Sequence, residues 1–215
     1  VLCWTVFALF AQDKHSPSHL LTEYLGEVAG ILFFLLGAMT IVELIDAHDG
    51  FEVITSRIKT TSKRKLVWIV GFLAFFLSAV LDNLTTTIVL VSLLRIIIPD
   101  KKDRLLFAGL VIIAANAGGA WSPIGDVTTT MLWIGGQITA GSIIIQTILP
   151  SLVCFLIPAF IISRQVKGNV ESMSMEGIKK ELTSSSRERN IVFWLGIGSL
   201  LFVPVFKTVT HLPPY

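Results

Sequence analysis

Long apolar segments make up most of this chain and constrain its fold more than any other feature. Hydrophobic residues account for 53% of the sequence, and the mean hydropathy is +0.77, above the range usual for soluble proteins. Backbone groups in a bilayer must be hydrogen-bonded within the protein, so we expect an all-α polytopic membrane protein. The apolar segments are approximately 1–11, 28–46, 66–98, 105–117, 127–137, 138–163 and 191–206.

The distribution of basic residues predicts the topology. Of the 17 Lys and Arg residues, 15 lie in 47–65, 95–104 and 164–190, which the positive-inside rule places on the cytoplasmic side. The net charge of +2 is small and dispersed, so nucleic-acid binding is not indicated. Both cysteines, Cys3 and Cys154, stand in apolar segments, which favours buried side chains over a disulfide or a metal site.

The segment 66–98 has basic residues beyond both ends, so it must enter the membrane and return on the same side. Its limbs, 66–81 and 84–98, contain 16 and 15 residues. As helices they measure about 24 and 22 Å, less than the hydrocarbon core of about 30 Å. The junction lacks a Gly- or Pro-rich aqueous turn. We therefore predict a re-entrant helical hairpin with Asp82 and Asn83 at its tip, in preference to two short full crossings.

A second interruption divides segment 105–137. Residues 115–126 contain three glycines and Pro123, a composition expected to end a helix. The flanking apolar pieces are too short to cross the membrane separately, and the charge pattern requires a single crossing. We therefore expect one discontinuous transmembrane helix, with non-helical backbone that lines a cavity or is buried in protein.

The two interruptions have similar compositions: Asp82 precedes a triple threonine at 85–87, and Asp126 precedes another at 128–130. Thr87 and Thr130 have an alternative structural role, bonding back to their own helix. An isolated carboxylate inside a membrane is costly, so each Asp is a candidate functional residue. Carboxylate, amide, hydroxyl and carbonyl oxygens suit a hard cation such as Na⁺ or Li⁺. Helix breaks at this depth are typical of secondary transporters.

Three stretches, 34–51, 81–87 and 116–130, resemble the NhaD family of Na⁺/H⁺ antiporters, within the ion transporter superfamily. The resemblance implies a carrier rather than an enzyme, with no catalytic residue, no cofactor and an inverted-repeat fold. Family members are about twice as long, so this chain resembles the first repeat plus one helix. The resemblance also implies that the missing second repeat completes the ion site, that the protein is a homodimer in the lipid bilayer, and that transport is elevator-like.

The expected organisation has three parts. Residues 1–163 form the first repeat, with scaffold helices, hairpin 66–98, broken helix 105–137 and helix 138–163; residues 164–190 form a cytoplasmic linker; residues 191–215 begin the second repeat. The ion- or proton-binding candidates are Asp82, Asn83, Thr85, Thr86, Asn116, Ser122, Asp126, Thr128 and Thr129, of which Asp82, Asn83 and Asp126 are the Na⁺ candidates.

Antiport follows if a proton and a cation compete for one carboxylate. The carrier must also switch between inward-facing and outward-facing states only when one of the two is bound. A Na⁺-coupled dicarboxylate symporter, an arsenite or oxyanion efflux carrier, and a non-transporting membrane scaffold or channel subunit are the alternatives. The acids at both breaks favour antiport, because they would repel an anion. The expected location is a bacterial inner membrane, with a plastid envelope as the alternative. His48 lies between acids at a membrane boundary and is interpreted as a solvated interfacial residue rather than a pH sensor.

Overall fold

The computed structural model describes residues 17–55, 60, 62–169 and 185–210, and apart from one isolated β-bridge their regular structure is entirely α-helical. The expectation of an all-α protein is confirmed, whereas the segment 1–11 lies outside the described residues. The helices are α2 (Pro17–Ala47), α3 (Glu52–Thr55), α4 (Lys63–Ser78), α5 (Asn83–Ile97), α6 (Lys101–Ala120), α7 (Val127–Ile134), α8 (Ala140–Gln165) and α9 (Ser186–Thr210).

Four described helices are long and apolar enough to cross a membrane: Tyr24–Ala47 within α2, and the whole of α6, α8 and α9. Many of their large apolar side chains are exposed, including Phe33 on α2 at 67% and Ile145 on α8 at 78%. Cys154 on α8 is also exposed, so the expectation that it is buried was wrong. In water such exposure would be unfavourable, whereas a bilayer accommodates apolar side chains. The protein is therefore an integral, polytopic membrane protein.

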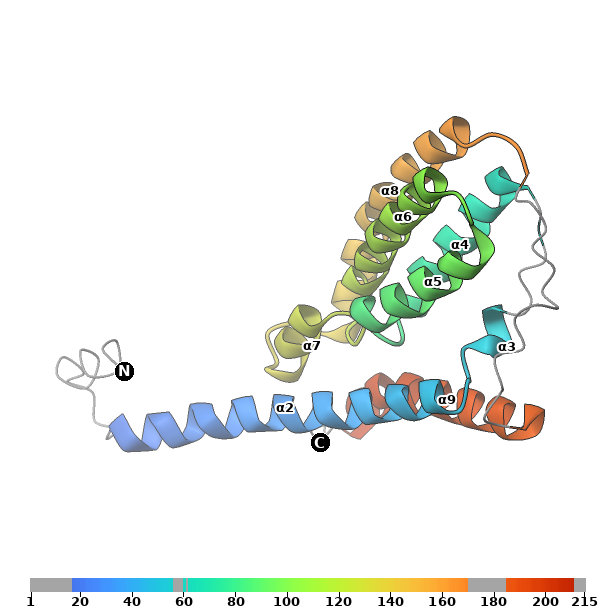
Figure 1. Cartoon of the computed structure of the whole chain (residues 1–215). Helices are drawn as coiled ribbons and strands as arrows, with labels where there is room; N and C mark the ends of the chain where they lie inside the picture. Colours follow the sequence, from blue (N-terminus) through green and yellow to red (C-terminus); the bar gives the residue numbers. More distant parts are fainter. Residues whose placement is uncertain (1–16, 56–59, 61, 170–184, 211–215) are drawn as a thin grey trace.

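The helices form two groups (Figure 1). In the first, α4, α5, α6 and α8 pack into a bundle around a buried cluster that includes Phe75, Leu110 and Phe155. In the second, α2 and α9 lie side by side and pack through residues such as Ile45 and Phe193. We refer to these groups as the bundle and the α2–α9 pair.

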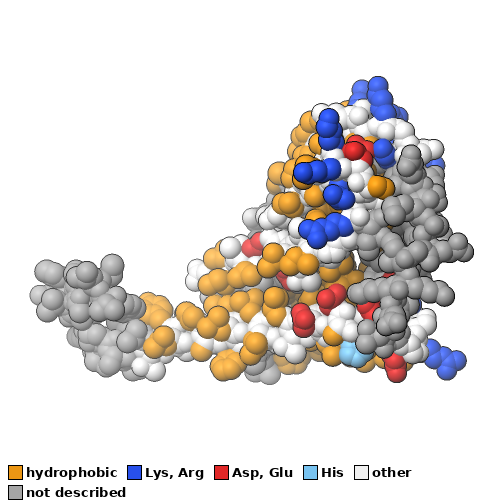
Figure 2. Space-filling view, in the orientation of Figure 1, with side chains coloured by type: hydrophobic (Ala, Val, Ile, Leu, Met, Phe, Trp, Pro, Cys, Tyr) orange, Lys and Arg blue, Asp and Glu red, His pale blue; other side chains and the backbone are white. Residues whose placement is uncertain are grey.

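Ionic and polar contacts join the helix ends that the charge pattern places on one side of the membrane. Lys63 at the start of α4 pairs with Asp103 at the start of α6, at 2.6 Å. The Arg64 Nε donates to the carbonyl of Ser163 near the end of α8, at 3.2 Å. Figure 2 shows Lys and Arg side chains gathered over the upper part of the bundle, where these ends meet. The basic ends of α4, α6 and α8 therefore lie together.

Helix α6 does not end where its glycines begin, and here the expectation from sequence was wrong. It continues through Gly118 and Gly119 to Ala120. A Cβ on Gly118 would lie 2.0 Å from the carbonyl oxygen of Phe75, and one on Gly119 would lie 2.4 Å from that of Gly125. These glycines therefore permit close packing of α6 against α4 and the following loop. The break itself spans residues 121–126.

The short helix α7 is held at its C-terminal end by the α2–α9 pair. The ammonium of Lys207 on α9 donates to the carbonyls of Trp133 at 2.6 Å and Ile134 at 3.3 Å. It also lies 4.4 Å from the centroid of the Trp133 ring, whose edge contacts Phe34 of α2. A cation at a helix C-terminus satisfies carbonyls that have no partner within the helix. Lys207 thus fixes the position of α7.

We predict that Gly118→Ala destabilises the full-length protein, because the new methyl group would meet the backbone of α4. Overpacking of this kind typically costs about 1–3 kcal/mol. Gly109→Ala is the matched control on the same helix, since a methyl group added there would meet no other described element within 4 Å. Thermal unfolding in detergent should show a lower Tm for Gly118→Ala alone. Equal Tm values for the two variants would contradict the close packing of α6 and α4.

We also predict that Lys207→Met lowers the Tm, because two carbonyls at the end of α7 lose their charged donor. Hydrogen bonds to charged groups contribute about 1.5–3 kcal/mol, and Lys207→Arg should retain part of this stabilisation. Thr208→Val is the control, because among the described residues the Thr208 hydroxyl bonds to the Pro204 carbonyl of its own helix alone. A Tm for Lys207→Met equal to that of Thr208→Val would argue against stabilisation of α7 by Lys207.

Candidate functional site

The first polar break lies between α4 and α5, where Asp82 is the N-cap of α5. Its carboxylate accepts hydrogen bonds from the Thr85 backbone N–H and from the Thr85 hydroxyl, both at 2.7 Å. The backbone of Asp82 has φ 151° and ψ 162°, a region populated almost only by glycine. Such a conformation costs about 1–3 kcal/mol and is often found at functional sites. The capping bonds hold Asp82 in this conformation.

The second break, between α6 and α7, has a similar local structure. Asp126 is the N-cap of α7, and its carboxylate accepts from the Thr128 backbone N–H at 2.8 Å and from the Thr128 hydroxyl. The Thr129 hydroxyl donates to the backbone carbonyl of Ser122 at 2.9 Å, which closes the loop onto the helix. Each break therefore presents an Asp carboxylate at a helix N-terminus.

One side chain joins the two breaks. The Asn83 Nδ2 donates to Asp126 Oδ2 at 2.8 Å and to Asn116 Oδ1 at 3.0 Å. Asn116 projects from α6 itself rather than from the break, and its own Nδ2 donates to the carbonyl of Ile112 at 2.8 Å. The tip of the α4–α5 pair, the body of α6 and the start of α7 thus meet at Asn83.

Contacts at the end of α4 also bring the two breaks close together. The buried Ser78 hydroxyl, at the end of α4, donates to the Ala115 carbonyl of α6 at 2.6 Å. A Cβ on Gly125 would lie 2.6 Å from the Ser78 carbonyl oxygen, so the second break also touches the end of α4 directly. The tip and the break are therefore in contact through backbone as well as side chains.

The structure separates the nine candidate residues into groups. Asn83, Asn116, Asp126 and Thr128 form one hydrogen-bonded network. Asp82 and Thr85 bond to each other, and no hydrogen bond between Asp82 and Asp126 occurs in the described part of the chain. Thr129 bonds to Ser122, which is buried and accepts the Thr129 hydroxyl through its backbone carbonyl. Thr86 is fully buried, and its hydroxyl has no hydrogen-bond partner among the described residues.

The last threonine of each triplet bonds to its own helix, as the structural alternative predicts. The Thr87 hydroxyl donates to the carbonyl of Asn83 at 2.7 Å, and the Thr130 hydroxyl donates to the carbonyl of Asp126 at 2.8 Å. Their side-chain oxygens are therefore engaged within the helix. The side chains in the hydrogen-bonded network that joins the breaks belong to Asp126, Asn116, Asn83 and Thr128.

Two supporting residues were not identified from the sequence. Ser78 was not singled out, because a serine at the end of an apolar helix carries no distinctive signal. Lys207 had a usable signal, since it is one of only two basic residues outside the three basic segments. An isolated cation at the far end of an apolar helix requires a partner, and α7 supplies that partner.

Comparison with known proteins identifies the family. The family model described as "Citrate transporter" matches residues 7–214. The chain is 47% identical over 215 residues to Sodium/proton antiporter 1 of Arabidopsis thaliana, covering all of this chain and 37% of that protein. It is 50% identical over 192 residues to Sodium/proton antiporter 2 of the same plant, covering 88% and 45% respectively.

Bacterial proteins match across a similar region. The Na⁺/H⁺ antiporter NhaD of Vibrio parahaemolyticus is 33% identical over 204 residues, which cover 94% of this chain and 47% of that protein. The chain thus spans less than half the length of these curated relatives. No solved structure matches it significantly. The resemblance found in the motifs is confirmed, and the chain belongs to the NhaD-type Na⁺/H⁺ antiporters, within the family described as citrate transporters.

Proposed function

We propose that the full-length protein exchanges Na⁺ or Li⁺ for H⁺, and that this chain supplies half of its ion site. The observation that carries the proposal is the Asn83 carboxamide, which joins the hairpin tip to the helix break beside Asp126. The names of the plant and bacterial relatives, all of them sodium/proton antiporters, support the same exchange.

Oxygen atoms around Asp126 provide the chemistry for cation binding. The Asp126 carboxylate, Asn116 Oδ1 and the Thr128 hydroxyl lie within one hydrogen-bonded network. Oxygen ligands of this kind suit a hard cation. A proton on Asp126 would remove the negative charge that attracts Na⁺, so the two ions compete for one group. This competition gives exchange if the carrier switches between the two sides of the membrane only when Na⁺ or H⁺ is bound.

Asn83 can act as a switch in this scheme. In the structure its NH₂ group faces the oxygens of Asn116 and Asp126. Rotating the carboxamide would direct Oδ1 toward the same two oxygens, an arrangement that is unfavourable unless a cation lies between them. The NH₂ orientation therefore suits the ion-free site, and the oxygen orientation suits the loaded site.

The topology we propose places both breaks inside the membrane. Helices α4 and α5, with 16 and 15 residues, form a re-entrant hairpin, and α6 and α7 are the two parts of one discontinuous crossing. Residues 1–163 constitute the first repeat, 164–190 the linker and 191–215 the start of the second repeat. The second repeat would cover the remaining faces of the breaks, because unmet backbone groups exposed to lipid cost several kcal/mol each.

A homodimer and an elevator-like movement remain part of the proposal. The membrane is that of a bacterium or the envelope of a plastid. Higher identity to the two plant relatives, 47% and 50%, than to the Vibrio parahaemolyticus protein, 33%, supports the plastid alternative.

An anion symporter is the second candidate, because the matching family model is described as a citrate transporter. Anion binding at helix N-termini requires free backbone N–H groups. At α5 the Thr85 N–H is already bonded to Asp82, and at α7 the Thr128 N–H is bonded to Asp126. Both helix N-termini are therefore neutralised by carboxylates of the chain itself. This arrangement favours cation exchange over anion binding.

We predict that Asp82→Asn and Asp126→Asn each abolish Na⁺-dependent H⁺ movement in everted vesicles, with expression nearly unchanged. Each substitution retains a hydrogen-bonding cap and removes the charge for which Na⁺ and H⁺ compete. Thr128→Val should mainly raise the apparent KM for Na⁺, because it removes one neutral oxygen. The Thr87→Val variant is a control, because the Thr87 hydroxyl bonds only within its own helix in the described part of the chain. Exchange near the wild-type rate in both Asp variants would contradict the mechanism.

We predict that the tip of the α4–α5 hairpin lies within the membrane. A cysteine placed at Val80, beside the tip, should react slowly with a membrane-impermeant thiol reagent added from the outer side. A cysteine at the exposed Gln137, after α7, serves as the accessible control. Rapid labelling at both positions would instead indicate two full crossings joined by a hydrated loop.

A further inference from the structure

Helix α7 connects the proposed ion site to the α2–α9 pair. It has only eight residues, Val127–Ile134, and measures about 12 Å at 1.5 Å per residue. Its N-cap Asp126 accepts from Asn83 at 2.8 Å, and its last two carbonyls accept from Lys207 on α9. A short helix moves as a rigid element, so a displacement at one end of α7 is transmitted to the other end. The position of Asp126 therefore depends on what holds the far end of α7.

The far end of α7 is held by one ammonium group and one buried ring. Lys207 Nζ donates to the carbonyls of Trp133 and Ile134, and among the described residues the Ile134 carbonyl has no other donor. Trp133 is 3% exposed, and its ring forms a T-shaped pair with Phe34 of α2 at a centroid distance of 6.3 Å. Removing the ammonium would leave the Ile134 carbonyl without a partner and would delete the charged link from α7 to α9.

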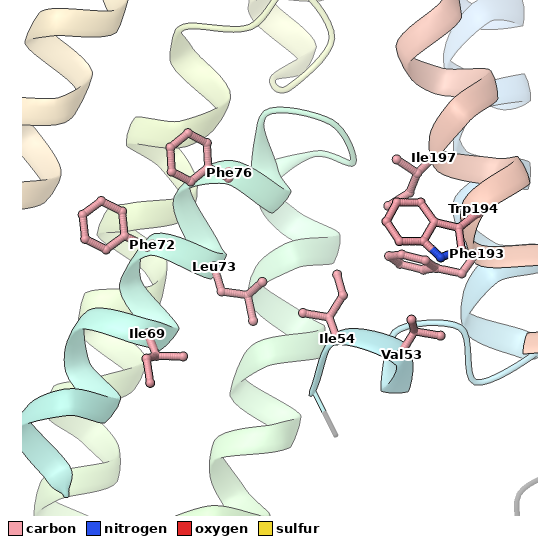
Figure 3. A pocket seen from close by; sticks show the side chains of 9 residues that line it. All are labelled: Val53, Ile54, Ile69, Phe72, Leu73, Phe76, Phe193, Trp194 and Ile197. Carbon is pink, nitrogen blue, oxygen red and sulfur yellow. The ribbon is translucent and has the colours of Figure 1, made fainter. Parts of the chain in front are cut away.

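The other contacts between the bundle and the α2–α9 pair are mainly apolar. Leu77, at the end of α4, shares an apolar cluster with Phe193 of α9. Farther along the same two helices, an apolar cavity of about 510 Å³ lies between Phe76 and Trp194 (Figure 3), so the helices are not closely packed there. Apolar contacts have no preferred direction, whereas hydrogen bonds from a charged group have a defined geometry. The bonds from Lys207 therefore fix α7 more closely than apolar packing can.

We propose that Lys207 is a positioning residue for the ion site. By holding the end of α7 against α9, it keeps the Asp126 carboxylate beside Asn83, with the oxygens of the site arranged for a cation. The described hydrogen bonds of Lys207 reach only the end of α7, so it acts through that helix and not on the ion. The inference rests on the proposed exchange at Asp126. It adds that the affinity for Na⁺ depends on the contact between α7 and α9.

Separate measurement of KM and Vmax tests this role, in everted vesicles that contain the full-length protein. Residues that orient the ligands of a metal ion change its affinity about 10–100-fold, and we expect Lys207→Met to raise the apparent KM for Na⁺ about tenfold. Lys207→Arg should keep most of the wild-type affinity, because it retains a cation at the same carbonyls. A residue with only a structural role would lower Vmax with the amount of folded protein and leave KM unchanged.

Two further variants make the test specific. Lys63→Met is the matched control, because it also removes a bonded ammonium, but at the start of α4, the end of that helix remote from the breaks. We expect it to leave KM for Na⁺ unchanged. Phe34→Leu loosens the contact of the Trp133 ring with α2 and retains Lys207, so it should raise KM in the same direction as Lys207→Met. It provides the measurement if Lys207→Met does not accumulate in the membrane.

The outcomes separate this inference from the proposed function. Wild-type protein that shows no Na⁺-dependent H⁺ movement would overturn the proposed exchange, and this inference with it. Wild-type exchange that Asp126→Asn abolishes, together with an unchanged KM in Lys207→Met or in Phe34→Leu, would overturn the positioning role alone. An equal rise of KM in Lys63→Met would also overturn it, because any loss of stability would then have the same effect.

Discussion

The central constraint on this structure is that a bilayer, in which the proposed topology places both helix breaks, offers no hydrogen bonds to broken backbone. Two helix interruptions expose N–H groups at the starts of α5 and α7, and each is met by the carboxylate of its own N-cap. Asp82 and Asp126 are therefore structural residues before any ion arrives. The same carboxylates are the charges that a transported cation would need. In the proposed mechanism, the same two side chains would therefore both cap the helices and bind the ion.

Close packing of the helices brings the α4–α5 tip and the start of α7 together. Small residues on α6 allow the carbonyl of Phe75 and the loop at Gly125 to approach the helix backbone, and Ser78 bonds to the Ala115 carbonyl. Bulkier residues would separate the α4–α5 tip from the start of α7. Asn83 could then no longer reach Asp126, which it now contacts at 2.8 Å. The site is consequently a product of helix packing and not only of its polar residues.

Much of the fold, but less of the site, could be predicted from the sequence. Apolar length predicted the helices, and the distribution of Lys and Arg agreed with the joined ends of α4, α6 and α8. Residues such as Gly118 were misinterpreted, because composition does not distinguish a glycine that ends a helix from one that admits a neighbouring backbone. The Asn83–Asp126 contact depends on the three-dimensional approach of segments 43 residues apart. No local pattern specifies which oxygen each amide will face.

The two acids are equivalent in sequence but not in structure. Asp82 bonds only within its own helix turn in the described chain, and its backbone is strained. Asp126 is bonded across to Asn83 and begins a helix whose other end is fixed by Lys207. A shift between the bundle and the α2–α9 pair would therefore act on the Asn83–Asp126 contact, because α7 is attached to both. It would leave the Asp82–Thr85 bonds intact. The geometry around Asp126 is thus the part of the site that depends on the relative position of the two helix groups.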